Sequence, residues 1–157
     1  KTNYKCLMPC NLYGPNDNYN PKTSHFFPAL LVKAIEVKKK KRNFILWGSG
    51  KPKRELMYVD DLADACLFAM EQYSQAELLN VGSGEDVSIK DLAEMMARVT
   101  GYPGEIRWDA SKPDGTPKRP LDYSKLLEKG WSPKYKLLDG LRETYKWFTE
   151  STDIQTR

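Results

Sequence analysis

Two spacings of apolar residues alternate along the chain and predict the order of strands and helices. Strands are predicted by short apolar runs bounded by turn formers: YKCLMP, NFILWG, ELMYVD, LLNVGSG and GEIRWDAS. Between these runs the apolar residues recur every three or four positions, as one helix face requires. Phe27, Leu30, Leu31, Ala34 and Ile35 show this spacing. The alternation predicts a mixed α/β domain.

Capping residues set the expected starts of the first two helices. Ser24 is the expected N-cap of a helix over residues 25–40. Either Asp60 or Asp61 is expected to cap a helix that reaches Gln72. These small polar side chains accept hydrogen bonds from the first free backbone N–H groups of a helix.

The second half of the chain is also predicted to be rich in helices. Ser88 with Asp91 opens an amphipathic helix that Gly101 closes. Two further helices are expected around residues 124–129 and 138–150. The stretches NLYGPNDNYNPKT and KPDGTPKRP, rich in turn formers, are expected to be loops.

Composition places the chain among ordinary globular domains. Its 157 residues fit one domain, and 40% hydrophobic with 29% charged residues does not resemble a disordered segment. The net charge is 25 − 21 = +4, much of it in KKKKR at residues 38–42. Such a run suits a helix C-terminus better than a nucleic-acid patch, so no nucleic-acid partner is expected. The modest positive balance favours an anionic ligand such as a nucleotide diphosphate.

Cysteine and histidine usage argues against a metal site and a disulfide framework. Cys6, Cys10 and Cys66 form no CxxC pair and have no metal-ligand spacing with His25, the single histidine. We therefore expect a reducing, cytoplasmic setting. No run reaches membrane-spanning length, and the start KTNYKCLMPC lacks signal-peptide character, so no membrane partner is expected. The chain opens almost directly into a strand pattern, and we interpret this as a fragment boundary.

Several motifs of complete enzymes are missing from the sequence. The two GSG stretches lack the third glycine of GxGxxG and lie in the wrong context for a dinucleotide fingerprint. No tyrosine has a lysine four residues later, a pair that short-chain dehydrogenases use for proton transfer. No GxSxG nucleophile elbow is present. The chain by itself is expected to catalyse no redox step.

Four stretches together resemble the GDP-L-fucose synthases, the GDP-4-keto-6-deoxymannose 3,5-epimerase-4-reductases of the extended short-chain dehydrogenase family. They are PCNLYGPNDNYNPKTSHFFPALL, WGSGKPKRELMYVDDLADA, LLNVGSGEDVSIKDLA and WDASKPDGTPKRPLDYSKLLEKGW. The resemblance covers essentially the whole chain but only the C-terminal half of such an enzyme. It implies the last Rossmann strand followed by a small α/β substrate-binding domain, with residues 1–157 as one region.

The resemblance implies that the PCNL stretch borders the nicotinamide end of NADP, which the N-terminal half of the family mostly binds. Cofactor contacts are thus expected from Pro9, Cys10, Asn11, Leu12 and His25. Without the resemblance, the same stretch reads as a strand-to-loop turn. Cys10 and Asn16 depart from the commoner Thr and His of the family, which bears on substrate preference.

His25 is similar to the family's histidine that donates a proton during epimerisation. Inverting a carbon beside a ketone requires a base on one face and an acid on the other, and an imidazole near its own pKa can serve as the acid. Taken alone, one histidine at a helix start is more often structural. The opposing base of the family is a cysteine in the N-terminal half, so none of the three cysteines here takes that role.

The nucleotide-sugar contacts implied by the resemblance are spread over the chain. Arg54 is expected to bind the diphosphate with two charge-assisted bonds. Trp47 would face the ligand, although an ordinary core or rim tryptophan is equally compatible with its position. The full expected set is Lys33, where the family commonly has Arg, Trp47, Arg54, Asp109 and Lys112.

The sequence is therefore interpreted as the substrate-binding portion of an NADPH-dependent enzyme that makes GDP-L-fucose from a GDP-sugar substrate. We expect the fragment alone to be inactive and the full-length enzyme to be a homodimer. Two alternatives stay open. One is a related epimerase or reductase acting on another nucleotide sugar. The other is a non-catalytic nucleotide-sugar-binding module.

Overall fold

A computed structural model of the chain describes residues 4–75, 77–118 and 121–155. Strands and helices alternate through these ranges, so the predicted α/β class is confirmed. The elements in chain order are β1 (Leu7–Pro9), β2 (Asn11–Tyr13), α1 (Phe26–Lys39), β3 (Phe44–Trp47), β4 (Lys53–Tyr58), α2 (Val59–Gln72), β5 (Leu79–Val81), β6 (Asp86–Ser88), α3 (Ile89–Thr100), β7 (Ile106–Asp109), α4 (Ser124–Glu128) and α5 (Leu137–Gln155).

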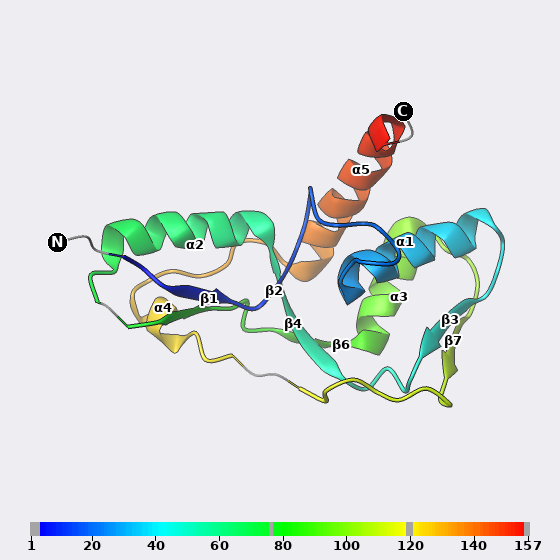
Figure 1. Cartoon of the computed structure of the whole chain (residues 1–157), viewed down its shortest axis with the longest axis horizontal. Helices are drawn as coiled ribbons and strands as arrows, with labels where there is room; N and C mark the ends of the chain where they lie inside the picture. Colours follow the sequence, from blue (N-terminus) through cyan, green and yellow to red (C-terminus); the bar gives the residue numbers. More distant parts are fainter. Residues whose placement is uncertain (1–3, 76, 119–120, 156–157) are drawn as a thin grey trace.

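Three small sheets organise the described residues. β1 pairs with β5 and β3 pairs with β7, both in parallel. In the third sheet β4 lies between β2, which is parallel to it, and β6, which is antiparallel. Figure 1 shows an elongated molecule with α2, α4 and the β1–β5 pair at one end, and α1, α3 and the β3–β7 pair at the other. α5 rises from the middle.

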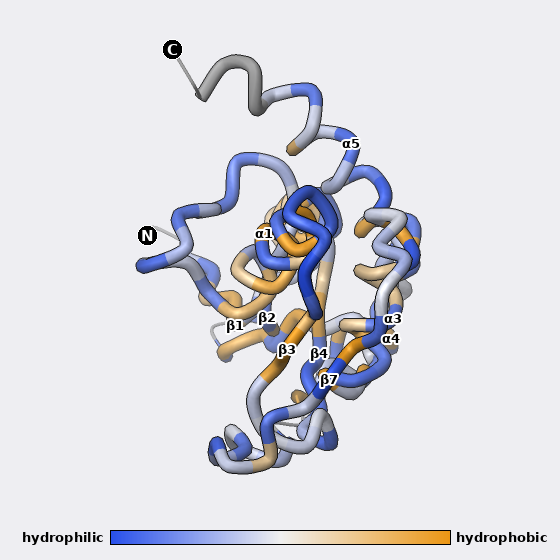
Figure 2. Tube along the Cα trace, turned by 90° about the vertical axis from the view of Figure 1, so that its right-hand side faces the viewer, coloured by the Kyte–Doolittle hydropathy of each residue, from blue (hydrophilic) through white to orange (hydrophobic). Residues whose placement is uncertain are grey.

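Strand β4 joins the two hydrophobic cores of the molecule. Successive residues of a strand point to opposite faces, so Leu56 packs into the core with α1 and α3, and Met57 packs into the core with α2 and β5. Figure 2 shows the apolar residues gathered along α1 and the strands, while the connecting loops are hydrophilic. The two hydrophobic cores thus lie on either side of β4.

The predicted starts of α1 and α2 are wrong. His25, not Ser24, is the N-cap of α1, and it makes no side-chain capping bond. The Ser24 hydroxyl is instead buried without a hydrogen-bond partner among the described residues. α2 begins directly after β4 with Tyr58 as N-cap, so Asp60 and Asp61 lie in its first turn. There the helix dipole still favours their charge.

Two short strands also correct the sequence prediction. Residues 11–13, expected in a loop, form β2, because their backbone pairs with β4. β6 was not predicted at all. The predicted start and end of α3 are confirmed: the Ser88 hydroxyl accepts from the Asp91 N–H at 3.0 Å, and Gly101 ends the helix with φ of +68°. Among the helices within the described ranges, none has the length and apolar content needed to span a bilayer.

Candidate functional site

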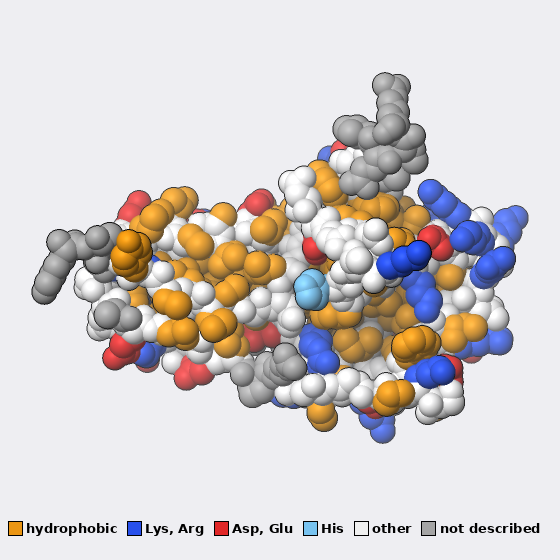
Figure 3. Space-filling view, viewed as in Figure 1, with side chains coloured by type: hydrophobic (Ala, Val, Ile, Leu, Met, Phe, Trp, Pro, Cys, Tyr) orange, Lys and Arg blue, Asp and Glu red, His pale blue; other side chains and the backbone are white. Residues whose placement is uncertain are grey.

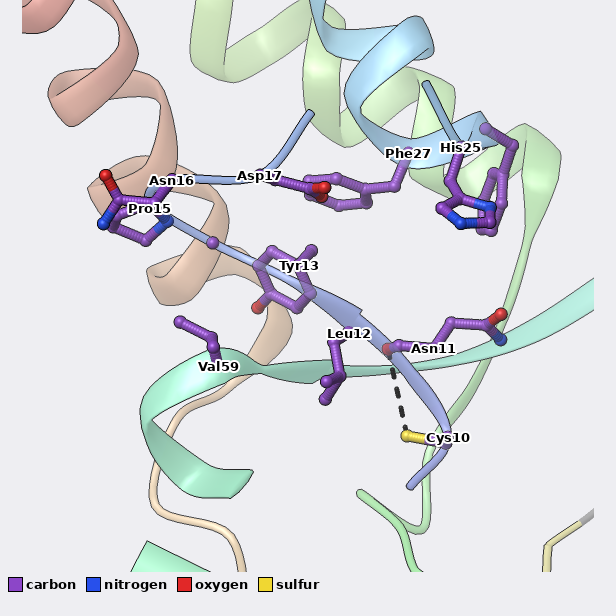
Figure 4. A pocket seen from close by; sticks show the side chains of 12 residues that line it. Cys10, Asn11, Leu12, Tyr13, Pro15, Asn16, Asp17, His25, Phe27 and Val59 are labelled. Carbon is purple, nitrogen blue, oxygen red and sulfur yellow. Dashed lines mark hydrogen bonds between the residues drawn. The ribbon is translucent and has the colours of Figure 1, made fainter. Parts of the chain in front are cut away.

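A cavity of about 390 Å³ opens where β2 ends and α1 begins, and it contains the single histidine. We call it the His25 cavity. Figure 4 shows β2 and the following turn along one side, with the His25 imidazole projecting from the start of α1 on the same side as Asn11. The lining residues are Cys10, Asn11, Leu12, Tyr13, Gly14, Pro15, Asn16, Asp17, His25, Phe26, Phe27 and Val59.

The turn that follows β2 has a backbone that few residues adopt. Gly14 has φ of +149°, and a Cβ at this position would lie 2.7 Å from Cγ1 of Val59. Asn16 has φ of +64°, a left-handed conformation that asparagine tolerates better than most residues. The YGPN sequence thus permits a close turn that carries the chain away from β4 and forms the outer wall of the cavity.

The predicted cofactor-contact residues lie close together. Cys10, Asn11, Leu12 and His25 all line the His25 cavity, while Pro9 ends β1 just before them. The Asn11 side-chain amide is held by donating to the Glu55 backbone carbonyl at 2.9 Å. His25 makes no side-chain capping bond to α1, so its imidazole is not used to hold the helix. An imidazole placed in this way is able to exchange a proton with a group in the cavity.

The Cys10 thiol has low reactivity in this arrangement. Burial, together with the negative charge of Glu55, raises the pKa of the Cys10 thiol to about 12. Glu55 is itself only 5% exposed, and its carboxylate accepts from the Gly84 N–H at 2.9 Å. A thiol with so high a pKa is neutral at physiological pH, and it is therefore a poor base or nucleophile.

A second, smaller cavity of about 230 Å³ lies beside the first, and Phe26 lines both. We call it the Arg54 cavity. In Figure 3 the histidine lies near the centre of the face, with Lys and Arg side chains beside it. The lining residues of the Arg54 cavity are Phe26, Trp47, Gly50, Pro52, Arg54, Ile89, Asp114 and Gly115.

The loop over residues 110–118 forms one wall of the Arg54 cavity and is held by several bonds to the rest of the molecule, including a backbone bond from the Lys53 N–H to the Pro117 carbonyl at 2.8 Å. Asp114 accepts from the Ser49 N–H at 2.7 Å and from the Ser49 hydroxyl at 2.6 Å. These two bonds, the hydroxyl first, hold the pKa of the Asp114 carboxyl below its usual range. Gly48 permits the approach, because a Cβ there would lie 2.3 Å from Asp114 Oδ1. Farther along, Nη1 of Arg54 donates to the Thr116 carbonyl at 2.7 Å.

The expected nucleotide-sugar residues are only partly brought together. Trp47 and Arg54 line the same cavity, and Lys112 Nζ lies 5.7 Å from the Trp47 ring centroid, within cation–π range. Lys33 is exposed on α1 and lines neither cavity. Asp109 also lies outside both linings, and its carboxylate accepts from the N–H and the hydroxyl of Ser111.

Sequence reasoning missed Asp114 and Phe26 as site residues. Asp114 stood in the turn sequence KPDG and was interpreted only as a turn former, although a turn also brings a carboxylate to the surface. Phe26 follows His25 and carries no chemical signal of its own. No group of three or more metal-ligating side chains occurs within the described part of the chain.

Residues 1–82 match the model of the NAD dependent epimerase/dehydratase family. The chain belongs to this family. The matched range includes every element from β1 to β5, and so every residue of the His25 cavity.

The chain is also similar to individual proteins over nearly its whole length. The chain is 49% identical over 145 residues to GDP-L-fucose synthase 1 of Arabidopsis thaliana, covering 92% of this chain and 45% of that protein. It is 43% identical over 160 residues to the GDP-L-fucose synthase of Escherichia coli strain K12, covering 96% and 50%. A GDP-L-fucose synthetase from Naegleria fowleri, solved bound to NADP, superposes with a TM-score of 0.89 at 29% identity, covering 95% and 47%. The chain therefore spans about half the length of these relatives.

Proposed function

We propose that the chain is the substrate-binding portion of an NADPH-dependent GDP-4-keto-6-deoxy-D-mannose epimerase/reductase that makes GDP-L-fucose. The observation that carries the proposal is a pair of cavities that share Phe26 in their linings: one is lined by an imidazole, the other by an arginine and an exposed tryptophan. A nucleotide sugar needs these two chemistries side by side, one for the sugar and one for the nucleotide. The likeness to GDP-L-fucose synthases over nearly the whole chain supports the choice of sugar nucleotide.

In this proposal His25 handles the sugar. Epimerisation removes a proton from a carbon beside the 4-keto group and returns one to the opposite face. The imidazole of His25 returns the proton, because it lies in the cavity and is not used in capping α1. The opposing base must come from elsewhere, since Cys10, the cysteine in this cavity, is held in its neutral form.

The Arg54 cavity would take the nucleotide. The Arg54 guanidinium uses Nη1 to hold the 110–118 loop, and its fork has further N–H groups that can bind a diphosphate oxygen. Trp47 is 70% exposed and offers a flat face to a base or sugar ring, with Lys112 beside it as a second cation. Asp114 provides an acceptor, which purine N–H donors require.

The His25 cavity also fits the nicotinamide end of NADP. Its lining includes the apolar Leu12 and the amide of Asn11, and an uncharged ring carrying an amide needs an apolar face and a hydrogen-bonding partner. Bound NADPH supplies the hydride for reduction of the 4-keto group. Pro9, Cys10, Asn11 and Leu12 would border it, and His25 would lie beside it in the same cavity.

Complete activity would require the other half of the relatives' length, with residues 1–157 as the C-terminal region. The end of the molecule with α2 exposes apolar side chains: Leu67 is 58% and Met70 64% exposed on α2, and Met8 is 50% exposed on β1. This surface is orange at the left of Figure 3. Exposed apolar surface of this kind is typical of an interface. We propose that a further α/β region covers it and that the complete enzyme is a cytoplasmic homodimer.

The test is calorimetric titration of GDP into the chain and its Arg54 variants. A charge-assisted hydrogen bond contributes about 1.5–3 kcal/mol, so Arg54→Ala should weaken binding roughly 10- to 150-fold. Arg54→Lys should recover only part of the loss, because an ammonium cannot reproduce the fork. Arg107→Ala is the matched control, because Arg107 lies on β7, outside both cavity linings, and pairs with Glu105 at 3.1 Å. Equal GDP affinity for Arg54→Ala and the parent would refute the nucleotide assignment.

A further inference from the structure

The outer wall of the His25 cavity belongs to a loop that is bonded mainly to itself. In residues 15–24 the Asn18 amide donates to the Thr23 hydroxyl at 3.0 Å, and the Ser24 N–H donates to the Asn20 carbonyl at 2.9 Å. Such local bonds give the loop a defined shape but do not attach it to the rest of the molecule. Pro15, Asn16 and Asp17 of this loop face the cavity.

Tyr19 is the single buried residue within residues 15–24, at 8% exposure. Its ring packs against α5, with centroids 5.8 Å from Trp147 and 4.8 Å from Phe148. Its hydroxyl donates to the Gly14 carbonyl at 2.8 Å, at the point where the loop leaves β2. One side chain therefore connects the C-terminal helix, the loop and the start of the cavity wall.

We propose that Tyr19 is a positioning residue that anchors the 15–24 loop to α5 and thereby fixes the cavity wall opposite His25. α1 holds the backbone of His25 through buried residues such as Phe27, but the facing wall has no comparable anchor besides Tyr19. Aromatic packing is energetically substantial, so losing it releases the wall. The importance of this wall for the reaction rests on the role proposed above for His25.

In this proposal α5 supports the loop, although no residue of α5 lines either cavity. Its half-buried Trp147 and Phe148 form the surface on which Tyr19 rests. Changes in α5 should therefore reach the His25 cavity through this contact. Figure 1 shows the loop after β2 passing beside α5 before it enters α1.

Two measurements on the 157-residue chain test the anchor, and neither requires a ligand. Hydrogen exchange read by mass spectrometry should show residues 15–24 exchanging at least about tenfold faster in Tyr19→Ala, with α3 unchanged. Because His25 is the single histidine, its imidazole gives one resolved set of NMR signals, which should move in Tyr19→Ala. Tyr19→Phe keeps the ring and should restore both readouts nearly to the parent.

Tyr102→Ala is the matched control. Tyr102 packs edge-on against Phe44 at 5.7 Å and its hydroxyl accepts from the Phe44 N–H, but it lies at the opposite end of α1 from His25. Its loss should leave the 15–24 loop and the His25 signals unchanged. Should Tyr19→Ala fail to fold, Phe148→Ala removes the closer of the two ring contacts from the α5 side and must give the same two changes to a smaller extent. Parent-like loop exchange and His25 signals in the folded Tyr19→Ala or Phe148→Ala variant overturn the anchor, whatever the GDP titrations show.

Discussion

Asp61 should be one of the most sensitive positions for stability, because its buried carboxylate joins two distant segments. It lies in the first turn of α2 and is 1% exposed. Its two oxygens accept from the backbone N–H groups of Lys134 at 2.9 Å and Tyr135 at 3.1 Å. These residues lie just before α5, so Asp61 fixes where that helix begins.

The cost of losing Asp61 follows from these two bonds. A hydrogen bond to a charged acceptor contributes about 1.5–3 kcal/mol, so Asp61→Ala should lower the free energy of unfolding by about 3–6 kcal/mol. Domains of this size are stable by only about 5–15 kcal/mol, so the variant should be close to unfolding. Asp61→Asn keeps one acceptor oxygen and should lose about half as much.

Urea unfolding followed by circular dichroism measures the effect, which should appear as a lower midpoint with an unchanged slope. Asp60→Ala is the control, because Asp60 shares the helix turn and the dipole but is exposed. That control should change stability by less than about 1 kcal/mol. If Asp61→Ala is no less stable than Asp60→Ala, the two backbone bonds do not hold α5 and the reasoning is refuted.

Three further predictions concern chemistry and association. The folded-state pKa of Cys10, about 12, lies above the ordinary 9.0, so iodoacetamide at pH 8 should modify the exposed Cys6 first, and the stability contributed by the buried Cys10 thiol should be lost as pH rises from 9.0 toward 12. Glu55→Gln should speed the labelling of Cys10, because it removes a negative charge that raises the pKa of this thiol. Equal labelling of Cys6 and Cys10 in the parent would contradict the burial of Cys10. In a complete epimerase-reductase, His25→Asn should reduce solvent deuterium exchange at sugar C3 and C5 while GDP affinity stays within a few fold, and undiminished exchange would return His25 to a structural role. Leu67→Lys should reduce self-association of the chain in sedimentation velocity, because Leu67 is 58% exposed on the apolar surface of α2; a parent that is monomeric at high concentration removes the basis for this expectation.

The elements that were predicted well from the sequence are those whose start, apolar face and end are all encoded by residues within the element. α3 has a capping pair, an apolar face and a terminal glycine, all within one stretch. β2 and β6 are three residues each, and they become strands only because β4 lies between them. No local pattern encodes that pairing, and the turn formers after β2 favoured a loop.

The predicted starts of α1 and α2 were wrong for a related reason, because residue type alone identified the capping residues. Ser24 has a good capping side chain, but α1 begins one residue later with His25 as N-cap, and the Ser24 hydroxyl is buried without a partner among the described residues. Asp61 has a second use that outweighs capping, namely two backbone N–H groups more than 70 residues away. Such competition becomes visible only once the distant segment is in place.

The candidate site also contains both contacts between neighbouring residues and contacts between segments far apart in the sequence. Asp109 ends β7 and Asp114 lies in the loop that follows, yet the Asp109 carboxylate accepts only local bonds, from Ser111 two residues on. Asp114 reaches Ser49 and lines the Arg54 cavity, and this contact depends on the pairing of β3 with β7. Pairing of these strands brings the turn after β3 and the loop after β7 to the same end of the sheet. The Arg54 cavity therefore depends on the β3–β7 register, whereas all lining residues of the His25 cavity except Val59 come from residues 10–27.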